Sequence, residues 1–212
     1  NAREECLLIN LCKASIVQEM KHVKSPQEFM RGNYTFMKLV VQVNRGAKER
    51  EFFSTLFQSL LDKVLNNNEL DLETNPMVIY QKCISQEESA TGQPSNRPFN
   101  INQAQALQSP DVLQILSEHL EMLRNITEEF LNAIINALDV MPYGMRVIAR
   151  ELRLVMEDNF PEVSPEEINK ILGNFVYYRY LSPVITAPEQ HIAIHHEISS
   201  LQRRNLAEIS KM

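Results

Sequence analysis

The sequence has 212 residues, of which 44% are hydrophobic, so it can bury a substantial core in one large domain or two small ones. Its formal net charge of -6 disfavours non-specific binding to nucleic acid, although a local basic face would be compatible with it. The sequence contains no long apolar run and no signal peptide, which argues against membrane insertion and secretion. Its three cysteines have neither paired spacing nor a metal motif, so they indicate reduced thiols in a cytoplasmic protein.

The apolar residues predict an all-α chain. There are only 5 glycines, strand-like alternation is absent, and helical spacing is the dominant signal. The first helix is expected over residues 2–21, with Leu7, Leu8, Leu11 and Ile16 among its buried positions. Further helices are expected over residues 25–43 (interrupted near Gly32), 47–65, from 76 onward, 109–140, 145–158, 164–182 and 200–211.

Two stretches predict breaks between these helices. Glycine in the segment Asn44-Arg45-Gly46 is free to take the left-handed conformation that ends a helix. Residues 86–100 hold two prolines, a glycine and several small polar residues, so no regular element is expected there. This second loop is long enough to be functional or simply mobile.

The segment from Ser164 to Pro183 carries the most informative pattern. A hydroxyl N-cap, a proline at the first helical position and two acidic residues predict a helix start at Ser164. Arg179 lies on the apolar stripe of that helix, where a buried guanidinium needs carbonyl or carboxylate partners. Pro183 is expected to end the helix, because the residue before a proline avoids the helical region. The alternative for Arg179 is a snorkelling side chain at a helix end.

Two further groups of residues are candidates for contact with a partner. Arg146, Arg150 and Arg153 share one face of the predicted helix 145–158, which is either a solvated surface or a contact face for an acidic partner. Asn75 is expected to cap a helix that begins at Pro76, which leaves Thr74 in the loop just before it.

The segment Tyr177-Tyr178-Arg179-Tyr180-Leu181-Ser182-Pro183 resembles the Phe-Leu-Arg-x-x-x-Pro signature of Ras GTPase-activating domains. Its Tyr-Tyr-Arg-Tyr form, followed by Ile185-Thr186-Ala187-Pro188, is similar to the GAP-related domain of IQGAP scaffold proteins, in a fungal or other non-animal version. The segments that resemble the same family, in the same order, are Asn44-Arg45-Gly46-Ala47, Ala90-Thr91-Gly92, Pro142-Tyr143-Gly144-Met145-Arg146 and Gln202-Arg203-Arg204-Asn205-Leu206.

This resemblance implies a single elongated, all-α, RasGAP-like domain over residues 1–212. Helices continue past this point in the family, so the resemblance also implies that the sequence ends inside the domain. Active members carry an arginine finger in the loop that matches Thr74, where it stabilises charge on the transferred phosphoryl group and is worth roughly 10³–10⁵ in rate. Threonine has no charge and cannot replace it. Arg31, in an Arg-Gly-Asn string, lies upstream of this loop in the family order and is not expected to be the finger.

The resemblance therefore implies a domain that binds a small GTPase in its GTP form, of the Rho type, without catalysing hydrolysis. Thr74, Asn75, Arg146, Arg150, Arg153 and Arg179 are its expected binding residues, and Arg179 with Pro183 is expected to brace the Thr74 loop. GTP and Mg²⁺ would belong to the partner, and no cofactor is expected. The parent scaffold would reach actin and calmodulin through its other parts, at the cell cortex or contractile ring, in cytokinesis.

Alternatives remain open. The domain could be an active GTPase-activating protein for a Ras-type GTPase, with another arginine entering the site, or a helical spacer that binds no GTPase. His191 and His195 have a spacing that can share a metal, but no third ligand completes a known site, so no metal is expected. Nothing else in the sequence resembles a catalytic motif, such as a phosphate-binding loop or a nucleophile elbow.

Overall fold

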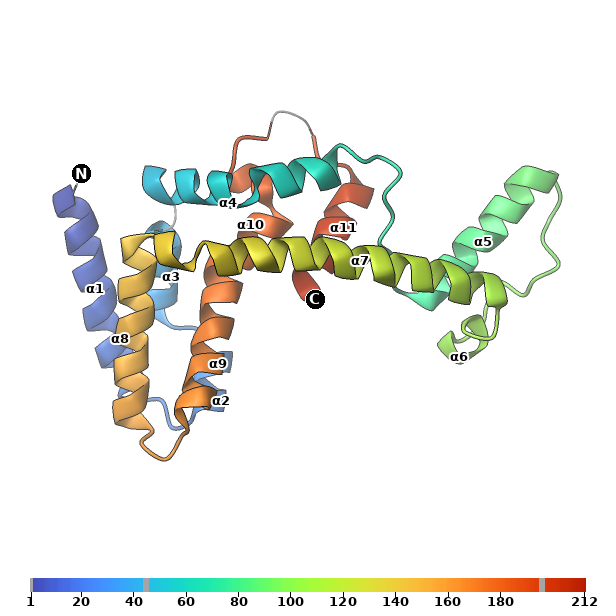
Figure 1. Ribbon diagram of the computed structural model, residues 1–212. Helices are drawn as coiled ribbons and strands as arrows, with labels where there is room; N and C mark the ends of the chain where they lie inside the picture. Colours follow the sequence, from blue (N-terminus) through green and yellow to red (C-terminus); the bar gives the residue numbers. More distant parts are fainter. Residues whose placement is uncertain (1, 44–45, 195–196) are drawn as a thin grey trace. The chain divides into compact units, whose positions relative to one another are not determined.

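The computed structural model describes residues 2–43, 46–194 and 197–212, and all regular structure within these ranges is helical, as predicted (Figure 1). The helices are α1 (Ala2–Met20), α2 (Pro26–Arg31), α3 (Thr35–Val43), α4 (Ala47–Leu65), α5 (Pro76–Thr91), α6 (Gln103–Ala106), α7 (Pro110–Asn136), α8 (Tyr143–Asn159), α9 (Pro165–Val176), α10 (Ser182–Thr186) and α11 (Ser200–Lys211). Three short turns lie between them: η1 (Leu138–Val140), η2 (Tyr177–Leu181) and η3 (Pro188–Gln190). Asn44 and Arg45 of the predicted break, and His195 of the histidine pair, lie outside the described residues.

The chain divides into two compact units. Unit 1 comprises Asn1–Gln58 and Ala133–His195, and unit 2 comprises Ser59–Asn132 and His196–Met212. The boundaries fall inside α4 and α7, so each of these helices contributes residues to both units. The expectation of a single domain over residues 1–212 stays a prediction.

In unit 1, α1 packs against α3 and α8, and α8 packs in turn against α9 (Figure 1). The stripe that α1 buries consists of Ile9, Cys12, Ile16 and Met20. The prediction that Leu7 and Leu11 are buried is wrong, because they are 71% and 51% exposed. Residues 7–9 are consecutive apolar residues that point to different sides of the helix, so helical spacing alone did not decide which side faces the core.

An aromatic cluster joins α2 and α3 to α9. Phe29 stacks on Tyr34 and on Phe36, with ring centroids 5.7 and 6.4 Å apart. Phe175, near the end of α9, tilts against Phe29 and Phe36 at 6.4 and 6.1 Å. The ring of Tyr180 then meets Phe175 edge-on at 6.1 Å. This cluster fixes the end of α9 and so places the η2 turn that carries Arg179.

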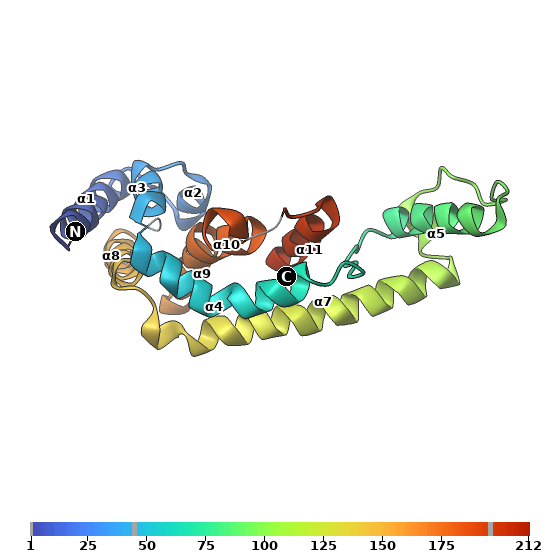
Figure 2. The ribbon, with the colours of Figure 1, turned by 90° about the horizontal axis from the view of Figure 1, so that it is seen from above.

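In unit 2, a small core joins α5, α6 and the start of α7, and Figure 2 shows α5 running beside this part of α7. Its buried members are Ile79, Tyr80 and Ile84 of α5, Ala106 of α6 and Val112 of α7. Asn75 accepts a hydrogen bond from the Met77 N–H and Pro76 occupies the first turn, so the predicted helix start is confirmed.

The prediction that residues 86–100 lack regular structure is wrong for the first part of that range. Helix α5 continues to Thr91, because Glu, Ser, Ala and Thr are tolerated in a helix. It ends at Gly92, whose φ of 68° closes the helix in the left-handed conformation. The rest of the loop is fastened to its neighbours: Arg97 pairs with Glu87 (3.2 Å) and Asp111 (2.6 Å).

Candidate functional site

The loop of residues 66–75, here called the Thr74 loop, connects α4 to α5 within unit 2. It has no regular structure of its own, so its backbone polar groups need partners from elsewhere. Most of these partners come from α11, whose start is fixed by a capping box between Ser199 and Gln202. Four side chains of α11 contact the loop or its preceding residue: Gln202, Arg204, Asn205 and Glu208.

Asn205 fixes the backbone at the centre of the loop. Its side chain is fully buried, accepts a hydrogen bond from the Leu72 N–H (3.0 Å) and donates one to the Leu70 carbonyl (2.6 Å). Gln202, also buried, donates to the carbonyl of Leu65 at the end of α4 (2.6 Å). These two amides replace the backbone hydrogen bonds that a strand or helix would have supplied.

Charged groups of α11 and of α5 hold the same loop. Asp71 pairs with Arg204 of α11 (2.8 Å) and with Lys82 of α5. Burial alone would raise the pKa of Asp71, but the hydrogen bonds from Lys82 and the Glu73 N–H and the charges of Lys82 and Arg204 outweigh it. The pKa of this carboxyl therefore lies below its usual value, and the pairing stabilises the ionised form.

Glu73 is the most highly connected residue of the loop. Its carboxylate accepts a hydrogen bond from the Asn75 N–H (2.9 Å) and pairs with Arg204 (3.3 Å). Its carbonyl accepts a hydrogen bond from Nδ1 of His119 on α7 (2.8 Å), which fixes the proton on that nitrogen. Its side chain is only 9% exposed, so removal of these partners would leave a buried charge.

Thr74 is half-buried and its hydroxyl donates a hydrogen bond to Glu208 of α11 (3.3 Å). The exposed residue next to it, Asn75, is engaged as the N-cap of α5. The loop thus holds a hydroxyl at position 74, turned toward a carboxylate of its own unit. It can present shape and hydrogen-bonding groups to a partner, but Thr74 supplies no cation.

The structure places Arg179 in the η2 turn of unit 1, half-buried between two helices. The prediction that Pro183 ends the helix is wrong. Helix α9 ends at Val176, η2 is a π-helical turn in which the Ser182 N–H bonds to the Tyr177 carbonyl, and α10 follows at once with Pro183 in its first turn. Backbone N–H groups in the first turn of a helix have no partner within that helix, so proline, which lacks an N–H, is tolerated there. The wider π turn before it makes room for the ring of Pro183.

Tyr180 follows Arg179 in the same turn. It is 1% exposed, and its hydroxyl has no hydrogen-bond partner among the described residues. Burial, together with the neighbouring Cys12 and Glu49, raises the pKa of this hydroxyl far above its ordinary value, so Tyr180 stays neutral. The π turn therefore combines an apolar interior with a half-buried cation.

Arg146, Arg150 and Arg153 lie exposed along α8, also in unit 1. Arg153 pairs with Glu157 one turn further along the helix (2.7 Å). The large apolar residue Tyr143, at the start of α8, is 63% exposed beside them. This face therefore combines cations with one exposed aromatic side chain, which fits a solvated surface as well as a contact face for an acidic partner.

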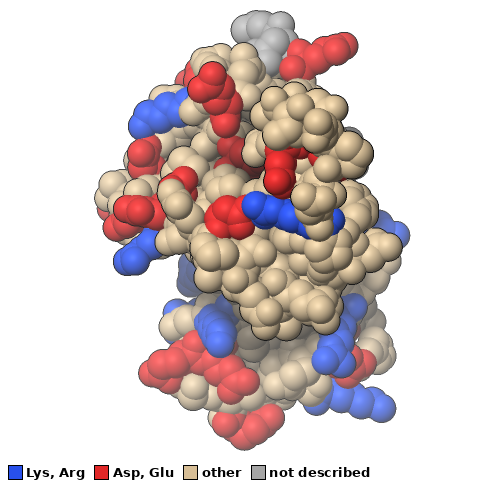
Figure 3. All heavy atoms as spheres, turned by 90° about the vertical axis from the view of Figure 1, so that its right-hand side faces the viewer, with Lys and Arg blue, Asp and Glu red and all other residues tan. Residues whose placement is uncertain are grey.

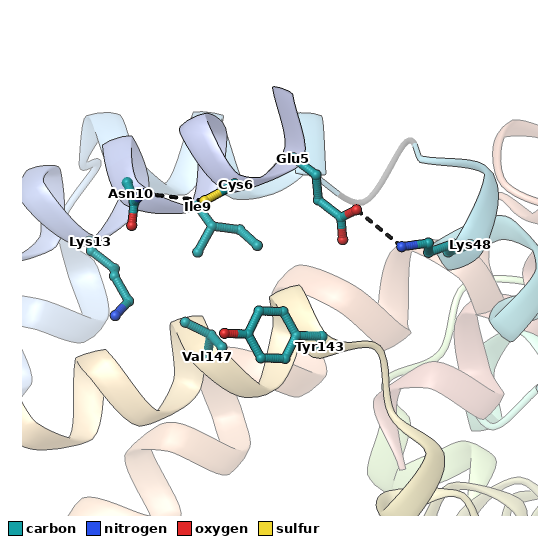
Figure 4. Close-up of a pocket in the computed structure, with 8 residues that line it drawn as sticks. All are labelled: Glu5, Cys6, Ile9, Asn10, Lys13, Lys48, Tyr143 and Val147. Atoms are coloured by element: carbon teal, nitrogen blue, oxygen red, sulfur yellow. Dashed lines mark hydrogen bonds and ion pairs between the residues drawn. The ribbon is translucent and has the colours of Figure 1, made fainter. Parts of the chain in front are cut away.

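A pocket of about 350 Å³ is lined by α1 between Glu5 and Lys13, by the start of α8 and by Lys48 of α4 (Figure 4). Its two lysines are both paired, Lys48 with Glu5 (3.1 Å) and Lys13 with Glu151 (3.2 Å). Cys6 accepts a hydrogen bond from the Asn10 amide at 3.6 Å, as Figure 4 shows. Since its charges are neutralised locally, this pocket carries no group set up for chemistry.

Positive and negative side chains are interspersed on the face shown in Figure 3, so no large field of one sign covers it. Within the described ranges, no three His, Cys, Asp or Glu side chains cluster as metal ligands. None of the described helices combines the length and apolar character that a membrane span requires.

The structure divides the predicted residues between the two units. Thr74 and Asn75 lie in unit 2, whereas the arginines of α8, Arg179 and Pro183 lie in unit 1. The bracing of the Thr74 loop by Arg179 therefore stays a prediction. Arg31 is the exposed last residue of α2, at a helix end rather than in a loop before a helix start.

Sequence reasoning missed the residues that hold the loop within unit 2. These are Asp71, Glu73, Lys82, His119, Arg204, Asn205 and Glu208. The only available signal was that Arg204 and Asn205 belong to a segment already noted for its family resemblance.

A family model described as GTPase-activator protein for Ras-like GTPase matches residues 11–212. Over the whole chain, the sequence is 37% identical to the human Ras GTPase-activating-like protein IQGAP2. It is 31% identical over 99% of its length to the Ras GTPase-activating-like protein rgaA of Dictyostelium discoideum, and 26% identical over all of it to rng2 of Schizosaccharomyces pombe.

These relatives are much longer than the chain. The chain spans 14% of the human IQGAP2 and rng2 proteins and 25% of rgaA. The matched relatives come from animals, an amoeba and fungi, so they leave the expected non-animal origin untested.

Proposed function

The chain belongs to the family of GTPase-activator proteins for Ras-like GTPases, and from this premise we propose that it binds a small GTPase in its GTP form without accelerating hydrolysis. Its similarity to IQGAP proteins, which are named GTPase-activating-like, supports this reading. The partner is a Rho-type GTPase, which supplies the nucleotide and Mg²⁺. The parent protein is a scaffold that reaches actin and calmodulin through its other parts and acts at the cell cortex or contractile ring in cytokinesis.

The observation that carries the proposal is that residue 74 is an uncharged threonine whose hydroxyl is bonded within the chain. An arginine finger stabilises transition-state charge by placing a guanidinium next to the transferred phosphoryl group. Position 74 holds a neutral hydroxyl that donates to Glu208 (3.3 Å), in a loop whose backbone is fixed by Asn205. A loop of this kind can dock against a GTPase as a rigid surface, but it contributes no cation to the reaction.

The cationic residues of unit 1 have a different role in this proposal. Arg146, Arg150 and Arg153 attract the acidic face of the GTPase and speed its association, with a strong dependence on salt. Arg179, held in the η2 turn with Pro183 close behind, braces the Thr74 loop and supports the binding surface from within.

Binding is tested with a panel of Rho- and Ras-type GTPases, each loaded with GDP or with a non-hydrolysable GTP analogue. We expect at least tenfold tighter binding to the analogue-loaded form of one Rho-type member. Equal affinity for both nucleotide states, or no affinity for any member, would overturn the proposal and leave a helical spacer.

Two sets of variants separate the two cationic roles. Arg146→Ala with Arg150→Ala should slow association several-fold while the thermal midpoint stays the same, because both side chains are exposed. Arg179→Ala should lower stability and GTPase affinity together, whereas Arg179→Lys should retain part of both. If Arg179→Ala folds and binds normally, Arg179 does not brace the loop.

A further inference from the structure

We propose that Glu208 of α11 is a positioning residue for the Thr74 loop: its carboxylate holds the side chain at position 74 against α11, away from any bound partner. This inference rests on the proposed function and deepens it. The absence of catalysis would then have two causes, the uncharged threonine and a carboxylate positioned to capture a cation at the same place.

The contacts of Glu208 carry the argument. One carboxylate oxygen accepts the Thr74 hydroxyl (3.3 Å), and the other pairs with Lys211 (2.7 Å). The Glu208 side chain is 14% exposed, whereas Lys211 is 68% exposed, so the lysine is a weak, solvent-screened competitor. Glu208 is therefore a largely desolvated anion whose contact inside the loop is the residue at position 74.

The fastening of the loop makes this contact persistent. Asn205 and Arg204, three and four residues before Glu208 on the same helix, tie Leu70, Asp71, Leu72 and Glu73 to α11. Residues at this spacing share one helix face, so the loop and Glu208 are held by a single rigid element. The backbone just before Thr74 cannot leave α11 unless several of these contacts break at once, so residue 74 stays within reach of Glu208.

The consequence for an arginine at position 74 follows from charge and geometry. A guanidinium pairs with a carboxylate through two parallel hydrogen bonds, which a lysine cannot form. In competition with Lys211, an arginine at this position would win Glu208 and remain folded against α11. A change of residue 74 alone would therefore not create a working finger.

The test uses double-mutant cycles on the full chain of 212 residues. Thr74→Val and Thr74→Arg are each combined with Glu208→Gln, and the unfolding equilibrium is measured in urea. Thr74→Val keeps the volume of the side chain and removes its hydroxyl, so its cycle measures the native contact even if Thr74→Arg folds poorly. Glu69→Gln is the matched control, because Glu69 is exposed in the same loop and engages Asn67 through its backbone N–H.

We expect a coupling of about threefold in the unfolding constant between Thr74→Val and Glu208→Gln. The coupling between Thr74→Arg and Glu208→Gln should be about tenfold and should weaken in high salt. Single-turnover hydrolysis by the GTPase panel should be unchanged with Thr74→Arg and faster with Thr74→Arg combined with Glu208→Gln.

The role of Glu208 would be overturned if the stability effects of the Thr74 and Glu208 variants were additive in both cycles. An equal coupling of the Thr74 variants with the control Glu69→Gln would overturn it as well. So would hydrolysis that Thr74→Arg alone accelerates as much as the double variant. If the unaltered chain itself accelerates hydrolysis, the proposed function fails, and the cycles measured on stability still decide whether Glu208 holds position 74.

Discussion

At Asn205, one buried amide makes the two hydrogen bonds that a regular element would otherwise have given to the Thr74 loop. It accepts from the Leu72 N–H and donates to the Leu70 carbonyl, and it is itself inaccessible to solvent. A buried backbone group that loses its partner costs about 1–3 kcal/mol. The loop therefore depends on this side chain more than on any contact of its own.

Asn205→Leu keeps the volume of the side chain but removes both hydrogen bonds. We expect a loss of about 2–4 kcal/mol in the free energy of unfolding, because two buried backbone groups are left without partners. Urea unfolding measures the loss, and hydrogen exchange at the Leu72 amide should become faster. Asn132→Ala on α7 is the control, because that residue is exposed and should change stability by no more than about 0.5 kcal/mol. A similar small effect for both variants would contradict the role of Asn205.

Asp71 makes the stability of unit 2 depend on pH. Its pKa is lower in the folded chain than in the unfolded one, where it is about 3.9. Its contribution is therefore fully present above that value and is lost as the pH falls through the folded pKa.

The variant Asp71→Asn has no carboxylate at any pH. It should be less stable than the unaltered chain by about 1–2 kcal/mol near pH 7, and this difference should shrink as the pH falls below about 3.9 and through the lowered pKa of the folded chain. Urea unfolding across this range measures it, with Asp139→Asn in the exposed η1 turn as control. A difference that stays constant down to the lowest pH would show that Asp71 does not act through its charge.

At the scale of the helices, the cap residues could be predicted from the sequence. Ser25, Asn75 and Ser164 were each expected to begin a helix, and each accepts a backbone N–H of the first turn. These signals are local, because a cap and the group it binds lie two or three residues apart. The all-α class could be predicted for the same reason.

The errors occurred where the outcome depends on distant parts of the chain. The buried face of α1 is chosen by α3 and α8, not by the local run of apolar residues. The hydrogen bonds between Asn205 and the Thr74 loop join residues more than 130 positions apart in the sequence. Thr74 and Asn75 could thus be identified from the sequence, but the α11 side chains that hold them could not.

Two glycines test the helix boundaries directly. An added Cβ would meet no atom within 4 Å at either Gly92 or Gly173, so space does not distinguish them. Gly92 has a φ of 68° at the end of α5, whereas Gly173 lies inside α9. Gly92→Ala should therefore destabilise by about 1 kcal/mol, and Gly173→Ala should stabilise by about 0.5–1 kcal/mol.

Thermal and urea unfolding of the two variants check that Gly92→Ala lowers stability and that Gly173→Ala raises it. Each glycine serves as the control for the other, since the same methyl group is added in open space. Stabilisation by Gly92→Ala would mean that α5 does not end at that residue.

At the scale of the whole molecule, the candidate contact residues are divided between two units, with Thr74 and Asn75 in one and the arginines in the other. The family model covers residues 11–212 and so includes both groups.

The central claim is that this chain binds a GTP-loaded GTPase and leaves its hydrolysis unaccelerated. The most direct measurement is single-turnover GTP hydrolysis by the panel of Rho- and Ras-type GTPases, with and without the chain, with binding followed in the same samples. We expect saturable binding to one Rho-type member and a hydrolysis rate that is unchanged or lower. An acceleration approaching the roughly 10³–10⁵-fold of an arginine finger would contradict the claim and show that another arginine enters the site.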